Sequence, residues 1–181
     1  LLVCGRLYSK LLVCGGTLPL NLNARRPAQT NSLLYEIPNL TGHKKYTIEE
    51  RVRWGDVDAA RIIFYGAYIR FFEFAETELF RAVNLPYSVM FDELDVWLPR
   101  VHIECDFHRA AQLDDLLEVS VYVGRFGNKS MRLDFEVRRK GETELVATAY
   151  FVLASVRRDT FETVPIPAEL RTRLAEYTKV S

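Results

Sequence analysis

Hydrophobic residues recur every three or four positions between residues 66 and 83, the repeat that places side chains on one face of an α-helix. This stripe consists of Tyr68, Phe71, Phe72, Ala75, Leu79, Ala82 and Val83. Because so much of it is aromatic, the stripe predicts a helix that lies deep against a sheet. We expect the acids Glu73, Glu76 and Glu78 to be charges facing solvent or an interface. Asn84-Leu85-Pro86 ends the helix.

Alternating hydrophobic and polar residues predict strands on both sides of this helix. The expected strands are 46–54, 97–108 (beginning after Pro99), 116–125, 130–140 and 145–156, with a helical turn or loop at 87–96 and a final helix at 168–177. Turn residues at Gly127-Asn128 and Gly141-Glu142 join the last three strands as antiparallel hairpins. The apolar strand 145–156 is expected at the centre. The pattern therefore predicts an α+β domain whose antiparallel sheet wraps around one long central helix.

The first part of the chain differs from the rest in composition. The letters LLVCG occur at 1–5 and again at 11–15, and residues 1–43 carry a net charge of +3 against −3 for residues 44–181. Residues 1–43 are acid-free before Glu36, which is typical of a targeting segment, but they also fit a disordered or mis-assigned extension. We favour the extension and expect residues 44–181 to form one domain.

Composition excludes several classes of function. A mildly acidic domain argues against nucleic acid as the main partner, because phosphate backbones require a basic surface. No apolar run approaches the roughly 20 residues that span a bilayer. The three cysteines, Cys4, Cys14 and Cys105, have no metal-ligand spacing and suit a reducing compartment such as the cytoplasm. We expect Cys105 to be a packing residue.

Two carboxylates, Asp56 and Asp58, directly precede a short apolar run at 62–65 and the start of the long helix. The first turn of a helix offers unpaired N–H groups and a partial positive charge, which can hold a polarised carbonyl oxygen. A carboxylate beside it can attack that carbonyl or deprotonate a water molecule. Aspartates in this position also commonly cap helices, and Asp56 is expected to shape the loop.

Three blocks of sequence resemble one known family. They are residues 56–68, from Asp56-Val57-Asp58 to the helix start, residues 111–119 at a strand entry, and residues 125–130 at a turn. Together they resemble the hotdog-fold acyl-CoA thioesterases of the 4-hydroxybenzoyl-CoA thioesterase type, including the Tol-Pal-associated bacterial acyl-CoA thioesterases. The resemblance covers roughly residues 46 to 167. It implies hydrolysis of an acyl-CoA thioester, with no metal and no cofactor.

The resemblance also implies roles for individual residues. Asp58 matches the catalytic carboxylate, which acts as nucleophile or general base, and the backbone amides of Tyr65 and Gly66 match the oxyanion site. Expected substrate-binding residues are Arg61, Arg125, Lys129, Ser130, Arg157 and Arg158. The family usually has Gly at the position of Arg61. A cation there could pair with Asp58, close the pocket or touch the acyl group.

Two other activities fit parts of the sequence. A hotdog dehydratase needs a histidine near the helix start, whereas His43, His102 and His108 lie in the extension or on strands and are expected to be structural. A non-catalytic acyl-CoA-binding hotdog module is the alternative to the enzyme. One helix does not cover a sheet of this size, so we expect a homodimer or homotetramer with sites at the interface. The sequence does not identify the acyl chain.

Overall fold

A computed structural model describes residues 43–179, and the expected extension lies outside the described residues except for His43. The elements in chain order are β1 (Tyr46–Arg51), the 3-10 turn η1 (Trp54–Asp56), α1 (Tyr65–Ala82), α2 (Tyr87–Leu94), β2 (Val96–Trp97), β3 (Arg100–Phe107), β4 (Leu116–Phe126), β5 (Ser130–Arg139), β6 (Leu145–Ala154), β7 (Val156–Arg157), α3 (Ala168–Arg173) and η2 (Ala175–Tyr177). None of these helices is both long and apolar enough to cross a membrane.

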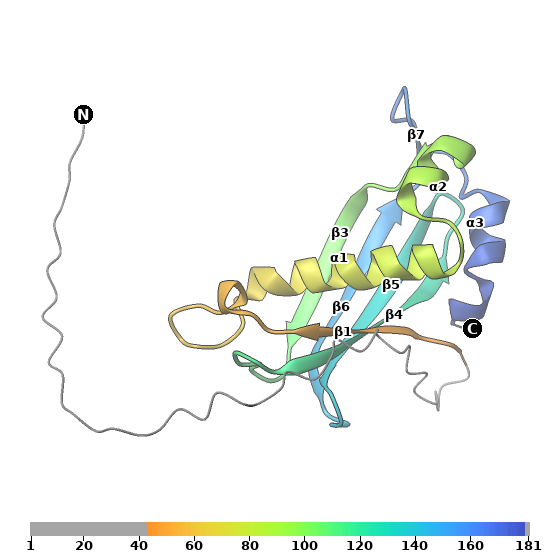
Figure 1. Ribbon diagram of the computed structural model, residues 1–181. Coiled ribbons are helices and arrows are strands. Elements are labelled where there is room, and N and C mark those ends of the chain that lie inside the picture. The colour runs from red at the N-terminus through yellow and green to blue at the C-terminus, as the bar shows by residue number, and fades with distance from the viewer. Residues whose placement is uncertain (1–42, 180–181) are drawn as a thin grey trace, which may run out of the picture. The chain divides into compact units, whose positions relative to one another are not determined.

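Five strands form an antiparallel sheet in the order β1-β4-β5-β6-β3, and α1 lies across one face of it (Figure 1). β2 and β7 pair with each other beside α2. The expected α+β class, with an antiparallel sheet wrapped around one long helix, is confirmed. The hairpins β4–β5 and β5–β6 also have the predicted antiparallel pairing.

The structure refines the bounds and the order of the expected strands. The strand expected within 97–108 after Pro99 is β3, while Trp97 belongs to the separate short strand β2, because proline has no N–H to donate to a ladder. The strand expected at 46–54 ends at Arg51, and Trp54 begins η1. β6 is an interior strand, but β5 occupies the middle of the sheet. β3 is not hairpin-linked to β4; it crosses to the opposite side of the sheet and forms the edge next to β6.

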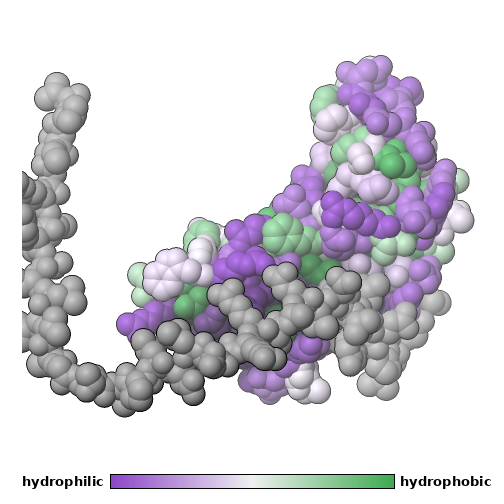
Figure 2. All heavy atoms as spheres, viewed as in Figure 1, coloured by the Kyte–Doolittle hydropathy of each residue, from purple (hydrophilic) through white to green (hydrophobic). Residues whose placement is uncertain are grey.

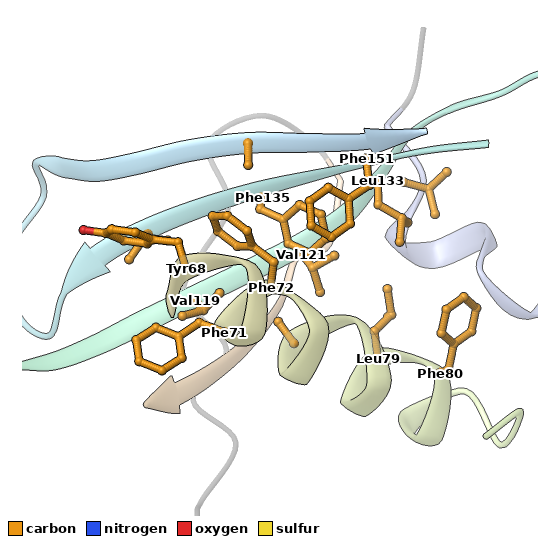
Figure 3. Packing of buried hydrophobic residues seen from close by; sticks show 14 of the residues in the cluster. Tyr68, Phe71, Phe72, Leu79, Phe80, Val119, Val121, Leu133, Phe135 and Phe151 are labelled. Carbon is orange, nitrogen blue, oxygen red and sulfur yellow. The ribbon is translucent and has the colours of Figure 1, made fainter. Parts of the chain in front are cut away.

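The core lies between α1 and the inner face of the sheet (Figure 3). Phe72 packs against Phe135 of β5 and Phe151 of β6, with ring centroids 4.9 and 5.9 Å apart. The two sheet rings are themselves 4.7 Å apart. Offset and edge-on ring pairs of this kind add stabilisation beyond the burial of apolar area. This contact therefore fixes the middle of α1 against the two strands.

The buried stripe of α1 matches the predicted stripe except near its two ends, and the main differences lie in the last turns. Ala82 is exposed, whereas Ala67 and Phe80, outside the predicted stripe, are buried. The difference has a tertiary cause, since α2 packs against the side of α1 that carries Phe80. The ring of Tyr87 in α2 lies 5.0 Å from that of Phe80.

Glu76 was expected to face solvent or an interface and instead is completely buried in the chain. Its carboxylate accepts hydrogen bonds from the Tyr87 hydroxyl and from Arg100, the latter at 2.7 Å. Burial raises the pKa of Glu76, and the Arg100 and Tyr87 contacts offset only part of this. The prediction failed because helical spacing does not reveal that α2 and β3 supply partners for an acid beside the apolar stripe.

The loop between β1 and α1 is held by backbone hydrogen bonds to residues 111–115. Val52 N–H donates to the Asp115 carbonyl at 2.9 Å, and Ile63 N–H donates to the Ala111 carbonyl at 2.8 Å. Within the loop, Arg61 has a φ of +62°, the left-handed region that favours glycine. Glycine, which the resemblance leads us to expect at this position, would adopt this conformation without steric cost.

We predict that Glu76→Ala lowers the free energy of unfolding by about 3 kcal/mol, because it leaves Arg100 and Tyr87 without their shared partner. Urea denaturation followed by circular dichroism measures this change. Glu78→Ala is the matched control on the same helix, since its ion pair with Arg81 is largely exposed, and it should shift stability by less than about 0.5 kcal/mol. Equal effects of the two variants would contradict a structural role for the buried carboxylate.

We predict that Arg61→Gly raises the free energy of unfolding by about 0.5–1 kcal/mol, because glycine adopts a positive φ without steric cost. Ala60→Gly is the control in the same loop, at a residue without a positive φ. It should lower stability by about 0.5–1 kcal/mol. Thermal unfolding of both variants checks the opposite signs, and a loss of stability in Arg61→Gly would show that the arginine side chain itself supports the loop.

Candidate active site

Asp58 lies in a narrow loop that folds back onto itself before α1. Val57 pairs with Ile63, and Asp58 N–H donates to the Ile62 carbonyl at 3.0 Å. One carboxylate oxygen of Asp58 accepts from Ala60 N–H at 2.8 Å, and the side chain is exposed. The loop thus presents an oriented, solvent-accessible carboxylate close in sequence and in backbone pairing to the helix start.

Asp56 supports this loop from within. It is only 1% exposed, and its carboxylate accepts from Arg53 N–H at 2.7 Å and from the Arg70 guanidinium of α1. Its carbonyl accepts from Phe64 N–H at 2.7 Å. The expectation that Asp56 shapes the loop agrees with these contacts. The contact between Asp56 and Arg70 has no signal in the sequence, because the two residues are 14 positions apart.

The start of α1 leaves backbone N–H groups open. No side chain of the described residues caps the helix, and Phe64, at the N-cap, uses its carbonyl to accept from Ala67 N–H at 2.9 Å. The amides of Tyr65 and Gly66 follow directly and belong to the first turn, where N–H groups have no partner within the helix. A Cβ atom at Gly66 would meet the exposed Phe64 ring, so the ring takes its present position only with glycine there.

An open hollow of about 910 Å³ lies beside the Asp58 loop. Its lining residues are Trp54, Val57, Asp58, Ala59, Arg61, Gln112 and Leu113. Gln112 is held there because it bridges to Ile62 of the loop. Arg61 faces the hollow and forms no ion pair with Asp58 or with any other acid of residues 43–179, so the carboxylate is not neutralised by it. Sequence reasoning gave no site role to Trp54, at the end of the expected strand 46–54, or to Gln112, in the block 111–119, because neither residue type at these positions marks a binding site.

The other expected site residues lie at the far end of the sheet in the same chain. Gln112 lies shortly before the start of β4, and the turn with Lys129 lies just after the end of β4. Because β4 has 11 residues, these two ends are separated by roughly 35 Å. Lys129 donates to the Thr163 hydroxyl at 3.3 Å, and Arg158 donates to the Phe91 carbonyl at 2.8 Å. Within one chain, Asp58, Arg61 and the helix start therefore lie together at one end of the sheet. The remaining expected residues lie at the other end: Arg125, Lys129, Ser130, Arg157 and Arg158.

Two other candidate groups have ordinary structural roles. Burial raises the pKa of the Cys105 thiol on β3 to about 11, with Asp106 adding to the shift, so the thiol stays protonated and weakly nucleophilic. His102 contacts the Tyr150 hydroxyl at 3.0 Å, and His108 contacts the Thr148 hydroxyl at 2.8 Å, both between β3 and β6. Neither histidine belongs to the hollow beside Asp58.

Comparisons with known proteins agree with this architecture. The chain is 29% identical over 126 residues to an acyl-CoA thioesterase, YbgC, of Haemophilus influenzae, covering 70% of this chain and 91% of the relative. The fold resembles the crystal structure of a 1,4-dihydroxy-2-naphthoyl-CoA thioesterase from Synechocystis, with a TM-score of 0.68 and 20% identity over 73% of this chain and 96% of the other. It also resembles a 4-hydroxybenzoyl CoA thioesterase variant solved with 4-hydroxybenzoyl CoA, with a TM-score of 0.67 and 23% identity over 72% and 98% of the two chains.

The family model of the thioesterase-like superfamily matches residues 52–174, which include the Asp58 loop, α1 and all the strands after it. This range agrees with the extent of the resemblance noted in the sequence. The chain belongs to the thioesterase-like superfamily and is a hotdog-fold thioesterase.

Proposed function

We propose that this protein hydrolyses an acyl-CoA thioester to the free acid and coenzyme A, with Asp58 as the reacting carboxylate. The observation that carries the proposal is the loop that holds an accessible Asp58 next to an uncapped helix start, along an open hollow. The relative from Haemophilus influenzae is named an acyl-CoA thioesterase. The neighbours from the solved structures act on aromatic acyl-CoA compounds.

The chemistry needs two elements that this loop supplies. The amides of Tyr65 and Gly66 donate to the carbonyl oxygen as it gains negative charge, in the positive field of the α1 terminus. Asp58 then either attacks the carbonyl carbon, expelling the coenzyme A thiolate and leaving an anhydride that water hydrolyses, or removes a proton from an attacking water. In both routes the thiolate is protonated and the acid is released. The thiolate is a good leaving group, so a carboxylate and an oxyanion site suffice.

The edge strand β3 supports a homodimer as the active unit. Its residues Val101, Ile103 and Phe107 are 62%, 44% and 52% exposed, whereas the inward-facing hydrophobic side chains of β4 and β5, such as Val121 and Leu133, are completely buried. Figure 2 shows hydrophobic side chains at the surface near the start of α1, among hydrophilic ones. An exposed apolar edge with unpaired backbone groups invites pairing with a second copy. A homotetramer of two such dimers is compatible with this edge.

Pairing of two β3 edges about a two-fold axis would complete the site. The two β3 strands would run antiparallel, which brings the start of one next to the end of the other. The end of β3 lies at the start of α1, where Phe107 contacts Tyr68 with ring centroids 5.2 Å apart. The start of β3 pairs with the end of β6, and Ala154 there pairs with Ser130. The turn with Lys129 in one subunit therefore approaches the Asp58 end of the other.

The dimer gives the second group of expected residues a role. In the dimer, coenzyme A bound at Asp58 of one subunit would face the second group of the other subunit: Arg125, Lys129, Ser130, Arg157 and Arg158. The cations of this group would neutralise the phosphate groups of coenzyme A. The alternative, a module that binds acyl-CoA without turnover, required Arg61 to block the carboxylate. The absence of an Arg61–Asp58 ion pair in the described part of the chain favours the enzyme. The free Cys105 agrees with a cytoplasmic location.

We predict that Asp58→Asn lowers kcat/KM for acyl-CoA by a factor of about 10²–10⁴, because the amide neither attacks nor accepts a proton. Thiol release from a panel of acyl-CoA compounds, followed with a thiol reagent, measures the loss. Asp114→Asn is the matched control, since Asp114 lies in the adjacent loop with a φ of +70° that asparagine also adopts. Full activity in a folded Asp58→Asn enzyme would refute the catalytic role.

We predict that the wild-type protein is at least a dimer and that Ile103→Glu converts it to an inactive monomer, because a charge enters the apolar edge. Size-exclusion chromatography with light scattering gives the mass, and the thiol assay gives the activity. His102→Glu places the same charge on the neighbouring residue, whose side chain points to the outer face, and should remain oligomeric. An active wild-type monomer would rule out the shared site.

A further inference from the structure

Trp54 is the most exposed large hydrophobic side chain in residues 43–179, with 81% of its surface accessible. The other tryptophan, Trp97, is packed within the chain: its ring lies 5.1 Å from Phe91 and 6.5 Å from Phe161. Trp54 has no such ring or cation partner among the described residues. Tryptophan is enriched among the residues that dominate binding, so an exposed indole on the wall of the hollow beside Asp58 is a candidate contact for a ligand.

The backbone that carries Trp54 is firmly held. Trp54 opens the 3-10 turn η1, and Asp56 N–H donates to the Arg53 carbonyl at 2.9 Å. The buried Asp56 carboxylate joins this turn to Arg70 of α1, so the turn is tied to the central helix (orange segment next to the start of α1 in Figure 1). The position of Trp54 is thus set by the same carboxylate that supports the Asp58 loop.

The surroundings of Trp54 indicate the chemistry of its ligand. Trp54 lines the hollow with Asp58, Arg61, Gln112 and Leu113. If the thioester carbonyl lies at Asp58, the sulfur and the arm attached to it extend into this hollow. That arm, pantetheine, has two amide groups and a dimethyl-bearing carbon. The indole face and Leu113 suit the apolar part, while the indole N–H and the Gln112 carboxamide suit the amides.

We propose that Trp54 binds the pantetheine arm of coenzyme A, with its indole face against the apolar segment of the arm. The inference rests on the proposed function, since it takes the site of the thioester from Asp58. It adds that Trp54 sets the preference of the enzyme for a thioester of complete coenzyme A over a thioester that lacks most of the pantetheine arm. Trp54 is a binding residue rather than a catalytic one, because its part of the hollow receives the carrier and not the reacting carbonyl.

Fluorescence tests this contact without requiring turnover. The chain has two tryptophans, so Trp97→Phe leaves Trp54 as the single indole reporter. Titration with coenzyme A and with pantetheine should change its emission, whereas adenosine 3′,5′-bisphosphate should not. A response to the nucleotide fragment alone would overturn the assignment to the arm. A blue-shifted, iodide-protected emission before ligand is added would also overturn it, because a partner subunit would then cover Trp54.

Kinetics test the effect on carrier preference. The ratio of kcat/KM for an acyl-CoA to that for the N-acetylcysteamine thioester of the same acid should fall about 10-fold in Trp54→Ala. It should recover in part in Trp54→Phe, which keeps a flat apolar face. Tyr150→Ala, an aromatic truncation on the outer face of the sheet, should keep the wild-type ratio.

The outcomes separate this inference from the proposed function. Hydrolysis of acyl-CoA with an unchanged ratio in Trp54→Ala would overturn the role of Trp54 and leave the enzyme assignment intact. No hydrolysis of any thioester by the wild-type protein, together with no binding of coenzyme A by calorimetry, would overturn both.

Discussion

The packing of the aromatic stripe of α1 on the inner face of the sheet is the constraint on which the rest of the structure depends. Phe72 lies against Phe135 and Phe151, and this contact sets where the helix crosses the strands. Truncating a buried phenylalanine typically costs about 3–5 kcal/mol, so a shifted helix is energetically inaccessible. The start of α1 is therefore delivered to a fixed place near the end of β3, and its open amides with it.

A second level of support connects the loop to that helix. The buried Asp56 carboxylate binds Arg53 and Arg70, and the Asp56 carbonyl receives Phe64 N–H. Asp56 consequently positions three parts of the site, namely Asp58, Trp54 and the first turn of α1. The loop carries strain at Arg61, whose φ of +62° costs about 1–2 kcal/mol for a residue other than glycine. The arginine gains no ion pair with any acid of residues 43–179 in return.

A single chain brings only some of the expected site residues together. The helix start and Asp58 lie at one end of the sheet, while Lys129 and Ser130 lie at the other. If a second copy paired with the exposed apolar edge of β3, it would supply the residues that lie at the other end of the sheet. Stability and catalysis would then share one interface, because the same strand pairing covers Ile103 and assembles the substrate-binding surface.

The sequence by itself determined the α+β class, the long buried helix and the loop carboxylate, because these depend on local periodicity and on a compact motif. It also indicated the superfamily through three short blocks. Only the tertiary structure decided that Glu76 is buried with Arg100 and Tyr87, that Ala82 is exposed, and that β3 is an edge strand. These features depend on contacts between residues distant in the chain, and no periodicity encodes such contacts. The exposure of Trp54 belongs to the same group, since this residue was expected in the strand 46–54 and only the placement of its neighbours leaves it exposed in η1.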